Sequence, residues 1–261
     1  MAHYKEIISV FPKSREEKLR SMKRFSMTDV FFYRSSLWHH ALRVHFIVNE
    51  LTKIAQGLLP QCDWEKASIL ALVHDDAEMI TGDVQLGHKQ VMTKEQLKEV
   101  RDNELAANQV LAQELSGNVG GYSYRELLQN ALEKDCIEAE VVSYADKFDA
   151  YCESMHEVLA GNLSALRAVI NYVATLENFK GKYPSLASLL NHKDSPLTNV
   201  HLRTDMWHVH QSNYVWLNRP HTSESIRQKT EFVFYNVWKQ LVLDNLGQEG
   251  LEVLTNQVEK P

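Results

Sequence analysis

The chain has 261 residues, 44% of them hydrophobic and 24% charged, a composition that is ordinary for a water-soluble globular protein. Its formal net charge of −6 argues against a nucleic-acid polymer as partner, because binding to a phosphate backbone needs a basic face. No apolar run approaches the roughly 20 residues that span a bilayer, and the N-terminus lacks the plan of a secretory signal. We therefore expect a cytoplasmic protein without a membrane partner, whose three cysteines are reduced.

Apolar residues predict an amphipathic helix from Leu37 to Gln56, with Val44 and Ile47 on its buried stripe. His40 lies on this stripe, whereas its neighbour His39 lies on another face. A single inward histidine is more often a hydrogen-bonded core residue than a metal ligand. His40 alone therefore does not identify a site.

A second helix is predicted from Glu65 to Ile80, with residues 62–65 as its cap region and Gly82 as its left-handed C-terminal residue. A polar helix follows from Thr93 to Glu114, and residues 116–121 form a loop.

Within the second predicted helix, His74 and Asp75 end a strongly apolar stretch, and Glu78 follows one turn later. A carboxylate buried there without a partner would cost several kcal/mol. A divalent cation would remove that cost. The alternative is that Asp75 and Asp76 form a solvated helix edge.

One or two helices are predicted from Tyr124 to Leu159, another from Leu163 to Phe179, and a last one from Ser223 to about Leu246. No stretch shows convincing β-alternation, so the predicted fold class is all-α. After Lys180 the composition changes to a segment rich in Trp, His and Asn. We therefore expect a domain over residues 1–180 and a C-terminal extension over residues 181–261 that packs on it.

Four side chains of ligand type lie on inward stripes of these helices: His40, His74, Asp75 and Asp146. Such stripes can converge on one metal ion in a helical bundle. Asp149 lies one turn from Asp146 and is a rival ligand. Imidazole and carboxylate ligands suit one divalent ion, Mn, Co, Fe, Zn or Mg, and the spacing does not choose among them.

The spacing H-x33-HD-x70-D resembles that of the HD-domain metal-dependent phosphohydrolases. The segment HDDAEMITGDVQLGHK resembles the HDxxExxTGD segment of one branch, the bacterial 5′-deoxynucleotidases. HHALRVH resembles their first ligand helix, and Ala145-Asp146-Lys147 their last ligand turn. The resemblance spans roughly residues 30 to 160 and implies an HD-domain helical bundle in which the four side chains named above bind the metal.

The resemblance also implies roles for other residues. Glu78 would orient or deprotonate the attacking water and later help protonate the leaving alkoxide, and Asp83 would lie near the sugar or the water. Lys89 and Arg34 would contact the phosphate. For this contact the basic residues ahead of the first helix are an alternative to Arg34; they are Lys13, Arg15, Lys18, Arg20, Lys23 and Arg24.

The function that this pattern favours is a 5′-nucleotidase that removes phosphate from deoxyribonucleoside 5′-monophosphates. A dNTP triphosphohydrolase is the nearest alternative, and it would need more cationic residues around the pocket. A cyclic-nucleotide phosphodiesterase is less favoured. Such enzymes of this superfamily usually carry additional histidines between the HD pair and the last aspartate, and here His88 is the one histidine between Asp75 and Asp146. A metal-binding module that senses nucleotides without hydrolysing them stays open. The resemblance further implies a homodimer.

Overall fold

A computed structural model describes residues 2–25, 35–84, 86–115, 117–159, 165–188 and Gln248. The chain divides into two compact units, of which the first comprises Met1–Arg24 and Ser35–Ala145 and the second Phe25–Arg34 and Asp146–Pro261. The predicted helix from Ser223 to Leu246 lies outside the described residues, as does Arg34. The division into residues 1–180 and 181–261 stays a prediction.

The first unit is helical, and its one small sheet is a hairpin in which Asn118 pairs with Ser123 and Val119 with Tyr122. The all-α prediction is confirmed. The elements of the first unit are α1 (Ala2–Ile8), α2 (Lys13–Ser21), α3 (Leu37–Ala55), α4 (Trp64–Val73), α5 (Glu78–Thr81), α6 (Leu86–Lys89), α7 (Lys94–Glu114), β1 (Asn118–Val119), β2 (Tyr122–Ser123) and α8 (Tyr124–Glu133), and α9 (Ile137–Leu159) begins in it.

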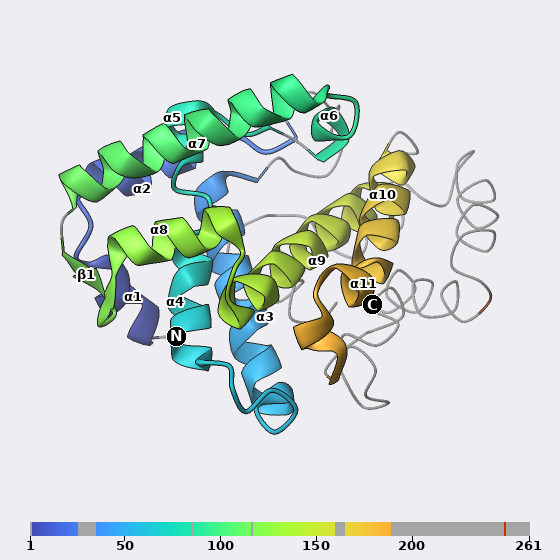
Figure 1. The fold of residues 1–261 in the computed structure, drawn as a ribbon, viewed down its shortest axis with the longest axis horizontal. Helices are drawn as coiled ribbons and strands as arrows, with labels where there is room; N and C mark the ends of the chain where they lie inside the picture. The colour runs from blue at the N-terminus through green and yellow to red at the C-terminus, as the bar shows by residue number, and fades with distance from the viewer. Residues whose placement is uncertain are drawn as a thin grey trace. The chain divides into compact units, whose positions relative to one another are not determined.

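The core of this unit is built on α3 and α4, which lie side by side in Figure 1. The predicted stripe on α3 is confirmed, since Val44, Ile47 and Leu51 are fully buried. A polar contact also joins the two helices, in which Nδ1 of His45 lies 2.8 Å from the backbone carbonyl of Ser68. These contacts set the face of α3 that carries His40 next to the end of α4.

Prediction and structure agree at the start of α4 and differ at its end. Asp63 is the N-cap and accepts a hydrogen bond from the backbone of Lys66 at 3.0 Å. The predicted helix from Glu65 to Ile80 is wrong as one element, because α4 ends at Val73. Residues 74–77 form turns, and the short α5 follows.

A side chain from α2 accounts for this break. In a continuing helix the amide of Asp76 would bond to the carbonyl of Leu72. That carbonyl instead accepts a hydrogen bond from the guanidinium of Arg15 at 2.8 Å. The amide of Asp76 bonds one residue closer, to the carbonyl of Val73 at 3.0 Å. The backbone therefore tightens into a turn where the local pattern favours more helix.

The hairpin packs on the middle of α4 through a glycine. Gly120 has a φ of +56°, and a Cβ built on it would lie 2.3 Å from a side-chain atom of Ile69. Only a residue without a side chain permits this approach. The hairpin then leads directly into α8, which begins at Tyr124.

Other predicted boundaries are close to those observed. Gly82 ends α5 with the expected positive φ of +81°, although its ψ of 159° is extended rather than helical. Thr93 caps α7 in a capping box with Gln96. The stretch from Tyr124 to Leu159 forms two helices, α8 and α9, and α8 ends at Lys134 in the left-handed conformation.

The second unit contains the rest of α9, followed by α10 (Leu166–Glu177), α11 (Phe179–Lys182) and the 3-10 helix η2 (Pro184–Leu186). The rings of Phe179 and Tyr183 meet edge to face at 5.0 Å between centroids, and Leu186 is fully buried. Among the described helices of the chain, none is both long and apolar enough to cross a membrane.

Candidate metal centre

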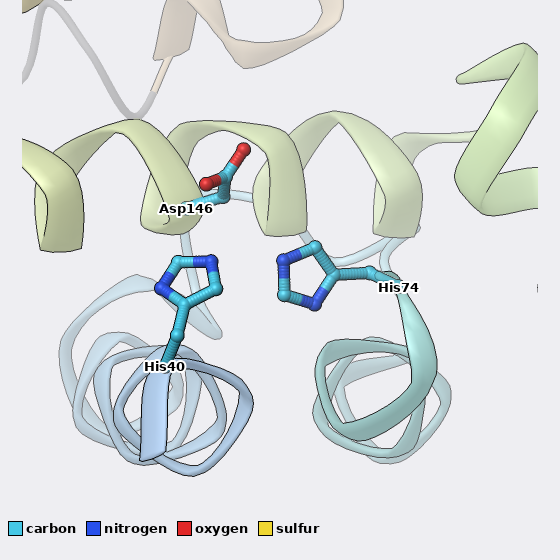
Figure 2. A group of neighbouring side chains, drawn as sticks. All are labelled: His40, His74 and Asp146. Atoms are coloured by element: carbon cyan, nitrogen blue, oxygen red, sulfur yellow. The ribbon is translucent and has the colours of Figure 1, made fainter. Parts of the chain in front are cut away.

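Two histidines and one aspartate form the candidate centre. His40 lies on α3, His74 directly follows the last residue of α4, and Asp146 lies on α9, at the point of that continuous helix where the second unit begins. One donor atom from each residue lies within 4.8 Å of the other two. Figure 2 shows the two rings side by side beneath Asp146, and their planes are tilted by 58°. The predicted convergence of these three side chains is therefore present in the structure.

Asp75 joins the two histidines through its own contacts. Its Oδ2 lies 3.3 Å from Nε2 of His40 and 3.3 Å from Nε2 of His74. Two ligand atoms that share a cation at about 2.1 Å are roughly 3.0 to 3.4 Å apart in octahedral or tetrahedral geometry. The spacing of these atoms therefore fits a shared divalent ion.

Backbone contacts orient the ring of His74 for this role. Its Nδ1 lies 2.9 Å from the carbonyl of Ala71, which can only accept a hydrogen bond. Nδ1 therefore carries the proton and Nε2 keeps its lone pair. A ligating histidine is commonly held in this way, with its second nitrogen bonded to a carbonyl or a carboxylate.

His40 is fully buried and contacts Arg24, which comes from the segment after α2. Nη1 of Arg24 lies 2.5 Å from Nδ1 of His40. A guanidinium only donates, so Nδ1 accepts, and the neutral ring carries its proton on Nε2, facing Asp75. A cation bound at Nε2 would replace that proton, and Arg24 would have to leave Nδ1.

The placement of Arg24 follows from backbone pairing. Lys23 and Ser36 form an antiparallel bridge, and the amide of Arg24 bonds to the carbonyl of Ser35 at 3.0 Å. This pairing sets Arg24 beside the first turns of α3, where its side chain is buried.

Glu78, at the start of α5, is the predicted acid or base. Burial, above all, and the carboxylates of Asp75 and Asp83 raise the pKa of Glu78 well above its usual value, while Arg24 and His40 act in the opposite direction. Its Oε2 is buried, and no hydrogen-bond partner reaches this atom from the described residues. Burial of this kind favours the protonated carboxyl group, and a nearby cation would favour the carboxylate.

The structure places the other predicted residues as follows. Asp83 follows Gly82 and lies close enough to Glu78 to influence its pKa. Lys89, on α6, forms an ion pair of 3.2 Å with Glu104 of α7. Arg34 lies outside the described residues. The assignments of Asp83, Lys89 and Arg34 stay predictions.

Two open alternatives can now be compared with the geometry. Asp146, and not Asp149, belongs to the group of converging donor atoms, and Asp146 is also ion-paired with Lys147. Asp75 and Asp76 do not form a solvated edge, because the side chain of Asp75 is 20% exposed and Asp76 is 1% exposed. Asp76 turns away from the centre to bond with Arg15.

Sequence reasoning named Arg24 only as one of six basic residues and preferred Arg34. Nothing in the local pattern separates Arg24 from its neighbours, because its position depends on the pairing of Lys23 with Ser36.

Comparisons with known proteins agree with this geometry. Residues 15–192 match the family model described as 5′-deoxynucleotidase YfbR-like. A 5′-deoxynucleotidase of Vibrio cholerae is 31% identical over 127 residues, which are 47% of this chain and 62% of that protein. One of Vibrio vulnificus is 29% identical over 124 residues, with the same two shares. The alignments thus span less than two thirds of these relatives.

The family match covers more than half of the chain and includes every residue of the centre described above. The chain belongs to the YfbR-like 5′-deoxynucleotidase family, within the HD-domain superfamily.

Proposed function

We propose that this protein is a metal-dependent phosphohydrolase that removes the 5′-phosphate from deoxyribonucleoside 5′-monophosphates. The observation that carries the proposal is the close approach of Asp75 to both histidines. Oδ2 of Asp75 lies 3.3 Å from Nε2 of His40 and 3.3 Å from Nε2 of His74. The family match and the two relatives named 5′-deoxynucleotidases support the choice of substrate.

In this proposal one divalent ion is held by His40, His74, Asp75 and Asp146, and Mn, Co, Fe, Zn and Mg all suit this ligand set. When bound, the ion supplies a Lewis acid for a phosphoryl oxygen and for the attacking water. The ligand set includes two carboxylates, so it favours a hard or borderline cation over a soft one.

Two further side chains complete the proposed chemistry. Arg24, displaced from His40 when the imidazole takes up its ligand role, contacts the phosphate with its planar fork of donors. Glu78 takes a proton from the attacking water and returns it to the leaving oxygen. A bond forms between the water oxygen and phosphorus, the bond between phosphorus and O5′ breaks, and the products are a nucleoside and inorganic phosphate.

The test is phosphate release from a panel of dNMPs, NMPs and dNTPs, with Mn²⁺ or Co²⁺ added to protein prepared without metal. Release of inorganic phosphate from dNMPs supports the proposal. Release of triphosphate from dNTPs would replace it with a triphosphohydrolase. Nucleotide binding without any release would replace it with a sensing module.

Variants of Arg24 test the phosphate contact. Arg24→Met is expected to raise KM for a dNMP by about tenfold or more, because a charge-assisted contact to phosphate is lost, while metal content stays unchanged. Arg20→Met is the matched control, since Arg20 lies four residues earlier, on α2, and is exposed and ion-paired with Glu16. An unchanged KM in Arg24→Met would remove this residue from the proposal.

A homodimer in the cytoplasm also belongs to the proposal. Light scattering coupled to size-exclusion chromatography measures the subunit count directly. A monomer that retains full phosphate release would reject the dimer and leave the chemistry intact.

A further inference from the structure

We propose that Arg15, Asp76 and Tyr124, hereafter the Arg15 network, are positioning residues that hold His74 and Asp75 in a turn and thereby set the affinity of the centre for its metal. The inference rests on the proposed metal centre and deepens it. None of the three residues touches the three converging donors of Figure 2; they act on the backbone that carries two of the ligands.

The Arg15 side chain makes three strong contacts from α2. Nε donates to Oδ2 of Asp76 at 2.8 Å, and Nη2 donates to Oδ1 of the same carboxylate at 2.6 Å. Nη2 also donates to the carbonyl of Leu72 at 2.8 Å. Arg15 is 6% exposed, and its Cζ lies over the ring of Phe11, 4.1 Å from the centroid. It is therefore held in one orientation, with its planar fork matched to the carboxylate.

Tyr124 closes the network from the other side. Its hydroxyl donates to Oδ2 of Asp76 at 2.7 Å, and its ring meets Phe11 edge to face at 5.4 Å between centroids. Burial, and then the charge of Asp76, raise the pKa of Tyr124, so the hydroxyl remains a donor at any ordinary pH. Both oxygens of Asp76 are thus satisfied inside the protein.

The Arg15 network contacts the chain on either side of the two proposed ligands, His74 and Asp75. Leu72 lies two residues before His74, and Asp76 directly follows Asp75. Arg15 therefore bonds to the chain on both sides of His74 and Asp75.

Without the hydrogen bonds from Arg15 we expect α4 to continue beyond Val73. The apolar pattern favours helix through residue 80, and α4 stops at Val73 because Arg15 occupies the carbonyl of Leu72. If that carbonyl were released, the amide of Asp76 could return to it. Residues 74–77 would then wind into α4. Successive side chains on a helix point about 100° apart, so Asp75 would leave the point where it meets both imidazoles.

A purely stabilising role explains the network less well. Two charges lose their hydration when they are buried, and well-packed apolar residues of similar size are often as stable or more stable. Stability alone therefore gives little reason for a buried arginine and aspartate at this place. The geometry at Leu72 requires a donor that also bonds a neighbouring carboxylate, and apolar side chains cannot supply it.

The chain contains a matched control for Tyr124. Tyr122 donates its hydroxyl to Oδ2 of Asp63 at 2.8 Å, at the opposite end of α4 from the ligands. Tyr122→Phe and Tyr124→Phe each remove one hydroxyl that donates to one aspartate. The two substitutions differ in which end of the helix they affect.

The experiment measures the dissociation constant of Co²⁺ by titration of metal-free protein, together with the Co²⁺ absorption spectrum and Tm. Arg15→Lys keeps the charge but cannot reach the carboxylate and the carbonyl at once. We expect it to weaken Co²⁺ binding by about tenfold or more and to change the spectrum, as losses around metal ligands commonly do. Tyr124→Phe should weaken binding in the same direction, and Tyr122→Phe should leave it unchanged.

A triple variant, Arg15→Met with Asp76→Leu and Tyr124→Phe, separates position from stability. We expect a Tm close to that of the wild type, since the buried charges are removed together, and Co²⁺ binding that is still weakened about tenfold or more. Wild-type affinity and spectrum in the triple variant, or in both Arg15→Lys and Tyr124→Phe, would overturn the inference. Should the wild type itself bind no Co²⁺ or Mn²⁺, the proposed metal centre would fail instead.

Discussion

The two ends of α4 use the same pair of residues for opposite purposes. At the N-terminal end Tyr122 donates to Asp63, and at the C-terminal end Tyr124 donates to Asp76, at 2.8 and 2.7 Å. Asp63 begins the helix by accepting the amide of Lys66. Asp76, together with Arg15, ends the helix before its pattern does. The same side-chain pair therefore begins the helix at one end and ends it at the other, depending on which backbone groups lie beside it.

The environments of the two pairs differ as strongly as their roles. Asp63 is exposed, and although burial acts to raise its pKa, hydrogen bonds from the amide of Lys66 and the hydroxyl of Tyr122 outweigh it and lower that pKa. Burial and the hydrogen bond to Asp63 raise the pKa of Tyr122 to about 12. Asp76 is buried and paired with Arg15. The exposed end can lose its aspartate at a modest cost, whereas loss of Asp76 alone would leave the buried guanidinium of Arg15 without its partner.

The largest effect is expected from Asp75, the proposed metal ligand next to the buried end of α4. Asp75→Ala should lose bound metal and phosphate release together, because the atom that joins both imidazoles disappears. Metal analysis of the purified variant and a phosphate assay measure the two quantities. Asp63→Ala, at the other end of α4, should keep both. Wild-type metal content in Asp75→Ala would exclude this residue as a ligand.

Glu78→Gln should retain metal and lower kcat by a factor of about 100 or more, because the amide can neither accept nor return a proton. The measurement is kcat in samples of matched metal content. Asp102→Asn, which removes an exposed carboxylate paired with Lys98, serves as the control for loss of a negative charge. A fully active Glu78→Gln would remove Glu78 from the chemistry.

Arg15→Met should destabilise the protein by about 3–5 kcal/mol, since it leaves the carboxylate of Asp76 buried without its cation. Urea denaturation followed by circular dichroism gives the free energy of unfolding. Adding Asp76→Leu should recover most of the loss. A loss below about 1 kcal/mol in the single variant would show that Asp76 is less buried than the structure indicates.

Asp63→Ala should cost about 0.5–2 kcal/mol, the usual range for the loss of an N-cap side chain. For a protein of this size each kcal/mol lowers Tm by roughly 2–4 °C. Thermal unfolding of the variant beside the wild type measures the shift. A loss as large as that of Arg15→Met would contradict the contrast between the two ends.

The smallest effect is a pH dependence at Asp63. Its folded pKa is lowered, so the stability that its charge provides is present above the unfolded pKa of about 3.9 and is lost as pH falls through the folded value. Asp63→Asn keeps a capping oxygen but not the charge. Its Tm should lie below that of the wild type at pH 7, and the two should converge as pH falls through the folded pKa of Asp63. A constant difference down to pH 2 would contradict this assignment.

Local patterns were sufficient for much of the site. The stripe on α3 oriented His40 inward, the cap region at residues 62–65 placed the start of α4, and the ordered ligand types gave the three donors that the structure brings within 4.8 Å of one another. The first two of these inferences depend on residues within a few turns of one another, whereas the ligand set spans residues 40 to 146 and came from the resemblance to the HD-domain phosphohydrolases. Helical periodicity is informative over a few turns.

The break after Val73 could not be predicted in the same way. It depends on Arg15, which lies 57 residues from the carbonyl that it occupies. Arg24 was not singled out for a similar reason, because its contact with His40 follows from the pairing of Lys23 with Ser36. Both features depend on contacts between residues far apart in the sequence, which the pattern of α2 and of the segment after it does not indicate.

The missing side chain at Gly120 gives the hairpin a mechanical role. The turn packs directly on Ile69, halfway along α4. Tyr122 and Tyr124, which follow the turn, therefore reach Asp63 and Asp76 at opposite ends of the helix. We expect a methyl group at residue 120 to push the hairpin away from α4 and to weaken both tyrosine–aspartate hydrogen bonds at once. Under the two proposals above, the stability of α4 and the affinity of the metal centre would therefore both depend on Gly120.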